Sequence, residues 1–547
     1  MSSNPLFLGL DLSTQQLKAV ITDRHYTVVH EASVHFDTDL PLHGTTGGVL
    51  KGPEDGQVTS PVEMWLGAID LLFERMENVD VDLSAVVAVS GACQQHGSVF
   101  WTDCAELLLS GLDPSQSLAS QLFPSAFSLH NSPTWQDSST TAACKRLEDL
   151  VGGPQALADL TGSRAYERFT GNQISRISRL YPAIYRATAR ISLVSSFVSS
   201  LFLARIAPIE VSDASGMNLM NVMSCKWEDK LLEICGGSEL RSKLGPEPVA
   251  GGTFLGKISP WWVQRWGFNQ DCIIASFTGD NPATVISLSA PGDAILSLGT
   301  STTFLLSIPP SSMSPKSFTT SHLLAHPIEP GGHIAMLCYK NGALAREQIR
   351  DRFANGSWTE FNRLVEDAPP GCAGFLGFYF LLPEIIPPNV KGEFYFTTNS
   401  TRADKKPHPV DDIPPSLHPR AILESQFLSI RSRIAAVLPE NSPPLQRLVI
   451  TGGSSANQTI RQLAADVLGM KVFVSTTKEA AGVGGALLAR YAWRKLVEND
   501  SGASVDMIDS EVSIGMECVA EPTPENTQIY DSFIPIYEAC ESQLLCM

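Results

Sequence analysis

The chain has 547 residues, several times the length that one compact core needs, so we expect two large domains. A composition of 43% hydrophobic and 18% charged residues is typical of a folded protein and excludes wholesale disorder. The formal net charge of −18 argues against a general nucleic-acid or anionic-membrane binder, because such proteins need clustered lysine and arginine.

The 11 cysteines are odd in number and scattered along the chain, without a CxxC pair or zinc-type spacing. This pattern favours reduced thiols over a disulfide framework or a structural metal site. The start, MSSNPLFLGLDLST, lacks a basic segment and a sustained apolar core, which predicts no signal peptide. Two apolar stretches, 191–209 and 375–388, are interrupted or short, so we expect buried core elements and no membrane span. We therefore expect a cytosolic protein.

The first elements alternate between strand and helix signals. An apolar run at Leu6–Leu12 predicts a buried strand, a polar turn follows at 13–16, and a second strand is predicted over 18–22. The sequence Ser60-Pro61-Val62-Glu63 is typical of a helix capping box, and apolar residues recur at helical spacing behind it. Residues 84–90 predict another buried strand. Such alternation predicts α/β domains.

A similar strand–turn–strand pattern recurs near the middle of the chain. Ala294–Leu298 is a short apolar run, followed by Gly299-Thr300-Ser301 and a strand over 302–307. The two places read LGLDLSTQQ and LSLGTSTTF, which indicates a weak internal duplication and two related domains. We predict a boundary that separates residues 1–289 from residues 290–547.

The last part of the chain contains one further strand–helix junction. Residues 448–451 predict a strand closed by Gly452-Gly453, and the helix behind it should stop at Gly469. Residues 397–419 predict a surface excursion rich in proline, lysine and aspartate. From about residue 498 the tail is acidic, with a final helix expected near 530–545.

Asp280 is the first candidate for chemistry. The sequence Thr278-Gly279-Asp280-Asn281-Pro282 follows a predicted strand over 272–277, and ligands of α/β sheets favour such strand ends. A carboxylate there can accept a proton from a hydroxyl that attacks a phosphoryl group. The alternative is an Asx turn that stabilises its own backbone.

Several other segments could bind phosphate, metal or sugar. Gly299-Thr300 can present amides and hydroxyls to phosphate oxygens, although plain hairpin turns have the same composition. Asp11, at a strand end, could hold Mg²⁺ through water or could be merely solvated. The segment from Gly452 to Asn457 allows close backbone approach to a nucleotide, but glycine pairs are also frequent in loops. His96 and Arg168 could bond sugar hydroxyls or could be structural.

Taken in order, these segments resemble the FGGY carbohydrate kinase family, and within it the branch that phosphorylates D-xylulose. The resemblance spans roughly residues 6–492. It rests on SGACQQHGSVFW, SRAYERFTGNQISRI, RISLVSSFVSSLFL, SDASGMNLMNV, FTGDNPA, LSLGTSTT and YKNGALAREQIR. One position departs from many relatives, because Ser13 stands where they have glycine.

The resemblance implies a fold and a set of site residues. The fold is α/β, with two actin-like, ribonuclease H-like domains and an active-site cleft between them. Asp280 is then the catalytic base and Asp11 the carboxylate near Mg²⁺. The sugar-binding residues are His96, Arg168, Asp280 and Asn281. The ATP-binding residues are Gly299, Thr300, Trp358, Gly452, Gly453, Ser454 and Asn457.

The implied reaction is in-line transfer of the γ-phosphoryl group from MgATP to the 5-hydroxyl of D-xylulose, with domain closure that expels water. A monomer or a homodimer is expected, with no nucleic-acid or membrane partner. Two alternatives stay open: an FGGY kinase for ribulose, glycerol or a similar polyol, and a non-catalytic actin-like protein that binds nucleotide.

Overall fold

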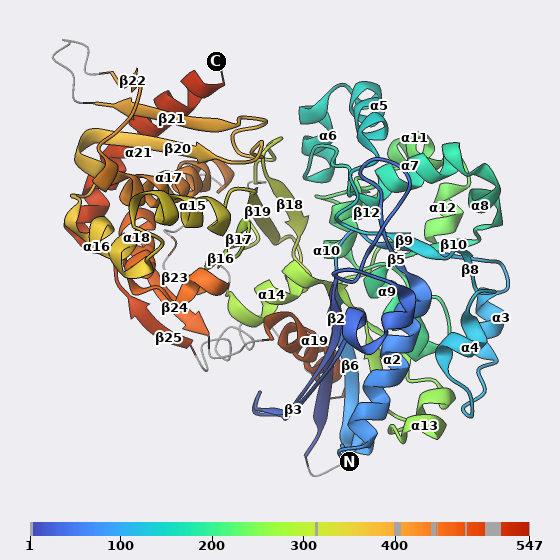
Figure 1. The fold of residues 1–547 in the computed structure, drawn as a ribbon. Coiled ribbons are helices and arrows are strands. Elements are labelled where there is room, and N and C mark those ends of the chain that lie inside the picture. Colours follow the sequence, from blue (N-terminus) through green and yellow to red (C-terminus); the bar gives the residue numbers. More distant parts are fainter. Residues whose placement is uncertain are drawn as a thin grey trace. The chain divides into compact units, whose positions relative to one another are not determined.

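The structure is a computed structural model that describes residues 4–290, 292–311, 315–398, 406–438, 445, 447–475, 479–497 and 516–545. Its contacts divide the chain into two compact units (Figure 1). Unit 1 comprises residues 1–288, 323–333 and 477–512, and unit 2 comprises residues 289–322, 334–476 and 513–547. The domain boundary expected between residues 289 and 290 remains a prediction. Of the predicted acidic tail, residues 498–515 lie outside the described ranges.

Unit 1 is built on a sheet with the strand order β13-β14-β6-β1-β2-β3, and β15 also pairs with β6. The predicted first strand and hairpin are confirmed, because β1 pairs antiparallel with β2 and parallel with β6. The strands are β1 (Leu6–Leu12), β2 (Gln16–Thr22), β3 (Val28–His35), β6 (Val86–Cys93), β13 (Phe254–Lys257), β14 (Ile273–Ala275) and β15 (Thr278–Gly279).

Helix α19 (Ala480–Val497) packs unusually closely on this sheet because its glycines leave room for backbone. A Cβ atom on Gly9 of β1 would lie 2.0 Å from the carbonyl oxygen of Gly482, and one on Gly485 would lie 2.6 Å from Cα of Gly91. A Cβ on Gly484 would lie 2.0 Å from the carbonyl oxygen of Ala283 in helix α14 (Asp280–Leu288). Helix α14 is therefore held in place by backbone contact with α19.

The other elements of unit 1 surround this sheet. Helices α2 (Val62–Glu77) and α9 (Val194–Leu203) contribute Trp65, Phe73 and Phe197 to its main core. The smaller strands are β4 (Leu50–Lys51), β5 (Val58–Pro61), β7 (Ser98–Trp101), β8 (Phe127–Leu129), β9 (Asn131–Pro133), β10 (Arg190–Leu193), β11 (Met220–Asn221) and β12 (Lys226–Trp227). The remaining helices are α1 (Phe36–Asp39), α3 (Ala105–Ser110), α4 (Leu118–Leu122), α5 (Thr141–Val151), α6 (Pro154–Thr161), α7 (Thr170–Leu180), α8 (Pro182–Ala187), α10 (Val211–Ala214), α11 (Asp229–Gly236), α12 (Leu240–Leu244) and α13 (Pro260–Trp266).

Unit 2 contains a sheet with the order β19-β17-β16-β23-β24-β25, which repeats the hairpin arrangement of unit 1. Here β16 pairs antiparallel with β17 and parallel with β23, as β1 does with β2 and β6. The strands are β16 (Ala294–Leu298), β17 (Thr302–Ile308), β19 (His333–Tyr339), β23 (Arg447–Thr451), β24 (Lys471–Ser475) and β25 (Met516–Ala520). In β18 (His322–Ala325) the chain passes from unit 2 back to unit 1.

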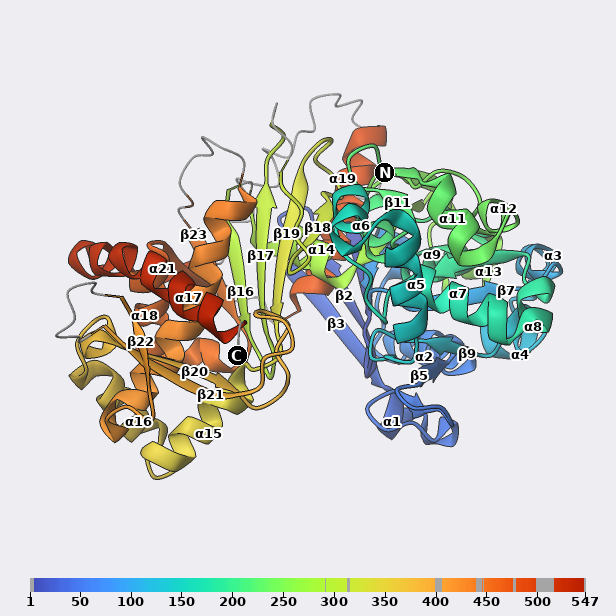
Figure 2. The same ribbon diagram turned by 90° about the horizontal axis from the view of Figure 1, so that it is seen from above.

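Helices α17, α18 and α21 gather on one side of this sheet (Figure 2). The final helix predicted near 530–545 is α21, and buried Tyr530 anchors it: its hydroxyl donates to Oε1 of Glu424 at 2.6 Å and accepts from Nη2 of Arg420 at 2.7 Å. The elements are α15 (Ala343–Phe353), α16 (Trp358–Asp367), α17 (His418–Val437), α18 (Gln458–Leu468), α21 (Pro524–Leu544), β20 (Phe375–Phe380), β21 (Gly392–Thr397) and β22 (His408–Val410).

Two local expectations need correction. Ser60 does not cap a helix, because Ser60 and Pro61 belong to strand β5 and α2 begins at Val62; Oγ of Ser60 instead donates to the carbonyl oxygen of Gly48. The surface excursion expected over 397–419 is shorter, because His418 is fully buried at the start of α17. Residues 399–405 of that excursion lie outside the described ranges.

The two apolar stretches form buried elements, as predicted. Residues 191–209 are mostly buried in β10, α9 and the loop that follows, and β20 supplies Phe378 to the interior of unit 2. Among the described residues, no helix is both long and apolar enough to cross a membrane.

Candidate active site

Asp280 lies where a short strand passes directly into a helix. Thr278 and Gly279 pair with Ala92 and Cys93 at the end of β6, and α14 begins at Asp280. A Cβ atom on Gly279 would lie 2.6 Å from Cγ of Gln95, so glycine is needed for the strand to approach that side chain. The predicted placement of Asp280 at a strand end is therefore confirmed, although β14 is shorter than the predicted strand.

Asn281 and Gln95 hold the Asp280 carboxylate in a polar cluster. Oδ1 of Asp280 accepts hydrogen bonds from the backbone N of Asn281 at 2.8 Å and from its Nδ2 at 3.1 Å. The same Nδ2 donates to Oε1 of Gln95 at 3.0 Å. Burial raises the pKa of Asp280 to about 6, and the hydrogen bonds from Asn281 oppose that rise. Asp280 is therefore mostly ionised at neutral pH yet basic enough to accept a proton.

Asp11 is a second buried carboxylate in unit 1. It stands in β1 opposite Lys18 of β2, and Lys18 forms an ion pair with Glu479. Oδ1 of Asp11 is buried and has no hydrogen-bond partner among the described residues. Burial raises the pKa of Asp11 to about 7, with further contributions from the negative charges of Asp280 and Glu479 against the opposing charge of Lys18. An orphaned carboxylate oxygen in this setting suits a divalent cation.

His96 and Arg168 contact each other directly. Nε of Arg168 donates to Nε2 of His96 at 3.4 Å, while Nδ1 of His96 lies 2.9 Å from the carbonyl oxygen of Gly216. The imidazole stacks on Phe169 at 4.6 Å between ring centres. Burial, and then the charge of Arg168, lower the pKa of His96 to about 3, so the ring is neutral. A neutral ring with Nδ1 protonated satisfies both contacts.

Two further buried acids, Glu210 and Asp213, lie near Asp280, and the sequence motifs predict no role for them. Oε2 of Glu210 accepts from Oγ1 of Thr278 at 2.6 Å, and its two oxygens also accept from the backbone N atoms of Ser212 and Asp213. Glu210 thus ties the strand before Asp280 to the start of α10. Burial raises the pKa of Glu210 to about 7 and that of Asp213 to about 8. The segment SDASGMNLMNV carries Asp213, but no local pattern reveals the bond between Glu210 and Thr278, which spans 68 positions.

The predicted phosphate-binding hairpin of unit 2 rests on the start of helix α15. The backbone N of Ala343 donates to the carbonyl oxygen of Gly299 at 3.1 Å. A Cβ atom on Gly342 would lie 2.7 Å from the carbonyl oxygen of Thr300, so only glycine fits there. The turn between β16 and β17 is therefore supported by backbone rather than by side chains.

The segment from Gly452 to Asn457 joins β23 to α18, as predicted. Gly452 has a φ of +86°, and its Cβ would lie 2.8 Å from the carbonyl carbon of Leu298. Oδ1 of Asn457 caps α18 by accepting from the backbone N of Ile460 at 3.2 Å, and its Nδ2 donates to Asn362 of α16 at 2.9 Å. Trp358 begins α16, and the guanidinium of Arg350 lies 4.8 Å from its ring centre.

Each predicted set of residues gathers within one unit. Asp11, His96, Arg168, Asp280 and Asn281 belong to unit 1, and the seven residues predicted to bind ATP belong to unit 2. No group of three or more His, Cys, Asp or Glu side chains that could hold a metal occurs in the described ranges. Mg²⁺ that keeps several waters does not need such a group. The individual roles of these residues remain predictions.

The chain belongs to the FGGY family of carbohydrate kinases. Residues 127–287 match the N-terminal domain of that family and residues 294–493 match the C-terminal domain. A chain with both domains is a carbohydrate kinase of the two-domain, actin-like fold.

Several relatives carry the similarity further. The chain is 42% identical to the xylulose kinase of Mus musculus over 539 residues, which cover 98% of this chain and 94% of the mouse protein. It is also 42% identical to a probable D-xylulose kinase A of Aspergillus clavatus, over 86% of this chain and 85% of the relative. Among solved structures, xylulose kinase from Rhodospirillum rubrum matches with a TM-score of 0.78 at 17% identity over 98% of this chain and 99% of that chain, which supports the fold.

Proposed function

We propose that this protein transfers the γ-phosphoryl group of ATP to the 5-hydroxyl of D-xylulose. The observation that carries the proposal is Asp280, an ionised carboxylate at a strand end beside polar side chains that can bond sugar hydroxyls. The substrate assignment rests on the near full-length similarity to the mouse enzyme named xylulose kinase.

Asp280 acts as the general base in this proposal. Its carboxylate accepts the proton of the 5-hydroxyl as that oxygen forms a bond to the γ-phosphorus. The bond between the γ-phosphorus and the β,γ-bridging oxygen breaks, and ADP leaves. A pKa of about 6 suits this role, because the carboxylate is available at neutral pH and can later release the proton.

The rest of the sugar site is made of neutral and cationic donors. Nδ2 of Asn281 is already fixed between Asp280 and Gln95, so it can orient a hydroxyl beside the base. The Arg168 guanidinium is only partly buried and is braced by Tyr166, whose ring centre lies 4.8 Å away. Because His96 is neutral, its contact with Arg168 leaves the positive charge of the guanidinium undiminished.

Asp11 is proposed to hold Mg²⁺ through water. Its unpartnered Oδ1 and raised pKa fit such a role, since a cation would relieve the cost of the buried negative charge. When bound, Mg²⁺ would neutralise phosphate charge during the transfer. Lys18, paired with Glu479, sets the local charge balance around Asp11.

ATP is proposed to bind to unit 2. Backbone amides near Gly299 and Thr300 would contact phosphate, and the segment from Gly452 to Asn457 with Trp358 would contact the adenosine. The positive φ of Gly452 and the braced indole of Trp358 support close, rigid contact with a flat ligand.

Sugar-dependent ADP release with MgATP tests the proposal, using D-xylulose, L-xylulose, D-ribulose and glycerol as acceptors. We expect D-xylulose to give the highest kcat/KM. A higher value for ribulose or glycerol would keep the kinase chemistry and overturn the substrate. No release with any acceptor would favour a protein that binds nucleotide without catalysis.

A further inference from the structure

Helix α15 carries a fully buried guanidinium next to the proposed nucleotide segments. Arg346 is 0% exposed. Its Nη1 donates to Oε1 of Gln426 at 2.8 Å, and its Nη2 donates to Oγ of Ser454 at 3.2 Å. Its Nε is buried without a hydrogen-bond partner among the described residues. Both bonds go to neutral oxygen atoms.

The charge of Arg346 lacks a bonded counterion within the described part of the chain, where no carboxylate forms an ion pair with it. Burial lowers the pKa of Arg346 to about 10, and the negative charge of Glu347 opposes this lowering. The guanidinium therefore stays protonated at neutral pH. A buried and unpaired cation is costly and is normally offset by an anion. Arg346 therefore carries a buried positive charge without a directly bonded anion in the described part of the chain.

The two acceptors of Arg346 lead to the two segments proposed to bind ATP. Ser454 belongs to the short 3-10 helix Gly453–Ala456. Gln426 donates from Nε2 to the carbonyl oxygen of Asn341 at 2.8 Å, directly before Gly342, which packs on the hairpin at Thr300. Arg346 thus links the segment from Gly452 to Asn457 with the hairpin at Gly299 and Thr300.

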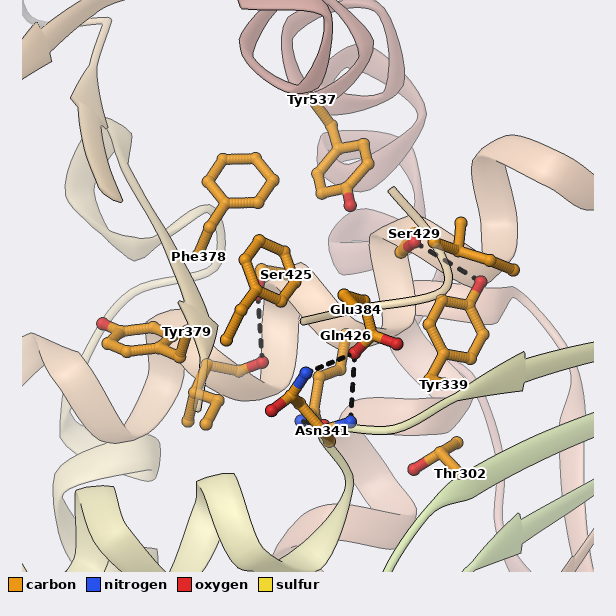
Figure 3. Close-up of a pocket in the computed structure, with 13 residues that line it drawn as sticks. Thr302, Tyr339, Asn341, Phe378, Tyr379, Glu384, Ser425, Gln426, Ser429 and Tyr537 are labelled. Atoms are coloured by element: carbon orange, nitrogen blue, oxygen red, sulfur yellow. Dashed lines mark hydrogen bonds between the residues drawn. The ribbon is translucent and has the colours of Figure 1, made fainter. Parts of the chain in front are cut away.

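Glu384 fixes the Asn341 end of this bridge (Figure 3). Its Oε2 accepts from the backbone N of Asn341 at 3.0 Å and from Nδ2 of Asn341 at 2.8 Å, and its Oε1 accepts from the backbone N of Lys340 at 2.7 Å. These bonds make the support of the hairpin rigid, so that movement of Arg346 would be transmitted to both segments.

We propose that Arg346 is a positioning residue for the nucleoside triphosphate: it ties the segment at Ser454 to the hairpin at Thr300, and its unpaired positive charge favours anionic phosphates there. This inference rests on the proposed ATP site of unit 2. If Arg346 only packed the helix, its loss would weaken ADP and adenosine binding equally. If Arg346 acts on the phosphates, its loss should weaken ADP binding more.

The test compares ADP and adenosine binding by calorimetry in Arg346→Met, Arg346→Lys and wild type. We expect Arg346→Met to raise the Kd of ADP by about tenfold or more, and that of adenosine by a clearly smaller factor, because the variant loses both the positive charge and the link between the two segments. Arg346→Lys should recover part of the ADP loss. In steady state, KM for ATP should rise while KM for D-xylulose stays within about twofold of wild type.

Arg352→Gln is the matched control, since Arg352 lies on the same helix with an exposed side chain paired to Glu393. It should bind ADP as wild type does. Should Arg346→Met fold poorly, Gln426→Leu removes the acceptor that links Arg346 to Asn341 and leaves the nucleotide segment unchanged. It should weaken ADP binding by about twofold to fivefold and adenosine binding by a smaller factor.

Equal losses of affinity for ADP and for adenosine, or no loss of affinity in either Arg346→Met or Gln426→Leu, would overturn the inference while leaving the ATP site intact. Failure of the wild-type protein to bind ADP would instead remove the proposed ATP site, and the inference with it.

Discussion

The two units carry similar hairpins over buried groups of opposite charge. In unit 1 the β1–β2 hairpin ends beside Asp11, and Asp280, Glu210 and Asp213 are further acids whose pKa values burial raises. In unit 2 the β16–β17 hairpin is supported by backbone at Gly342, and the buried group behind it is Arg346. One scaffold thus serves two kinds of chemistry.

This difference suggests a division of labour. Carboxylates with raised pKa values can accept a proton or hold a cation, which suits the sugar side of a phosphoryl transfer. A buried, unpaired guanidinium and exposed amides suit the anionic side. If the account is right, substitutions in unit 1 should change catalysis and metal dependence, and substitutions in unit 2 should change nucleotide binding.

The largest effect should come from Asp280→Asn. Removing the proposed base should lower kcat by about 10²–10⁴-fold, because general bases contribute on that scale. KM for D-xylulose should change little, since Asn can still bond a hydroxyl. Steady-state rates of ADP release measure both. Asp271→Asn is the control, because Asp271 is exposed and pairs only with the exposed Lys257 among the ion pairs of the described residues. This variant should keep the wild-type kcat. A kcat within about threefold of wild type would remove Asp280 from the role of base.

A smaller catalytic effect is expected for Asp11→Asn. Loss of the carboxylate should raise the Mg²⁺ concentration needed for half-maximal rate by about tenfold to a hundredfold, as is typical when a partner of metal-bound water is lost. A Mg²⁺ titration at saturating ATP and D-xylulose gives this value. An unchanged Mg²⁺ dependence would contradict the assignment of Asp11.

Asp11 also predicts a pH dependence of stability without ligand. Its pKa is about 7 in the folded protein and near 3.8 when unfolded, so the folded state binds more protons between these values. The contribution of Asp11 to the free energy of unfolding is fully present below about pH 4 and is lost as the pH rises towards 7. Urea unfolding at several pH values should therefore show a smaller loss of stability over this range in Asp11→Asn than in wild type. Parallel curves for the two proteins would argue against a raised pKa.

In unit 2, Gly452→Ala should destabilise the fold by about 1–3 kcal/mol, because alanine at φ +86° is strained and its Cβ would meet Leu298. Thermal unfolding should show the lower midpoint. Gly453→Ala is the matched control for stability, since its Cβ would meet nothing within 4 Å. Equal midpoints for the two variants would show that the backbone at Gly452 is not constrained as described.

The smallest effect concerns the activity profile at low pH. With a pKa of about 6, Asp280 becomes protonated as pH falls below that value, so kcat/KM for D-xylulose should fall about tenfold per pH unit there. Rates measured from pH 5 to 8 would reveal the break. A profile that stays flat down to pH 5 would mean that proton transfer does not involve this group.

Local patterns predicted the elements that depend on local chemistry. Strand β1 has the predicted bounds, and Gly469 ends α18 in the left-handed conformation that its position suggested. The helix cap predicted at Ser60 was wrong, because this segment forms a strand instead. Pro61 pairs with Asn131, which lies 70 residues away, and no local pattern indicates that pairing.

The ion pairs and buried charges could not be predicted either, because their partners are distant in the chain. The ion pair of Lys18 with Glu479 spans 461 positions, and Arg346 forms hydrogen bonds with Gln426 and Ser454, which lie 80 and 108 positions further along the chain. An arginine in a helix usually lies at the surface, so the sequence gives no sign of its burial. The individual site residues were reached through the family resemblance, because isolated glycines, histidines and aspartates carry little information alone.

The central claim is phosphoryl transfer to the 5-hydroxyl of D-xylulose, and ³¹P NMR of a reaction with MgATP tests it most directly. We predict that loss of the γ-phosphate signal is matched by one phosphomonoester signal coupled to the methylene protons at C5. Appearance of inorganic phosphate alone, or of a phosphomonoester at another carbon, would contradict the account.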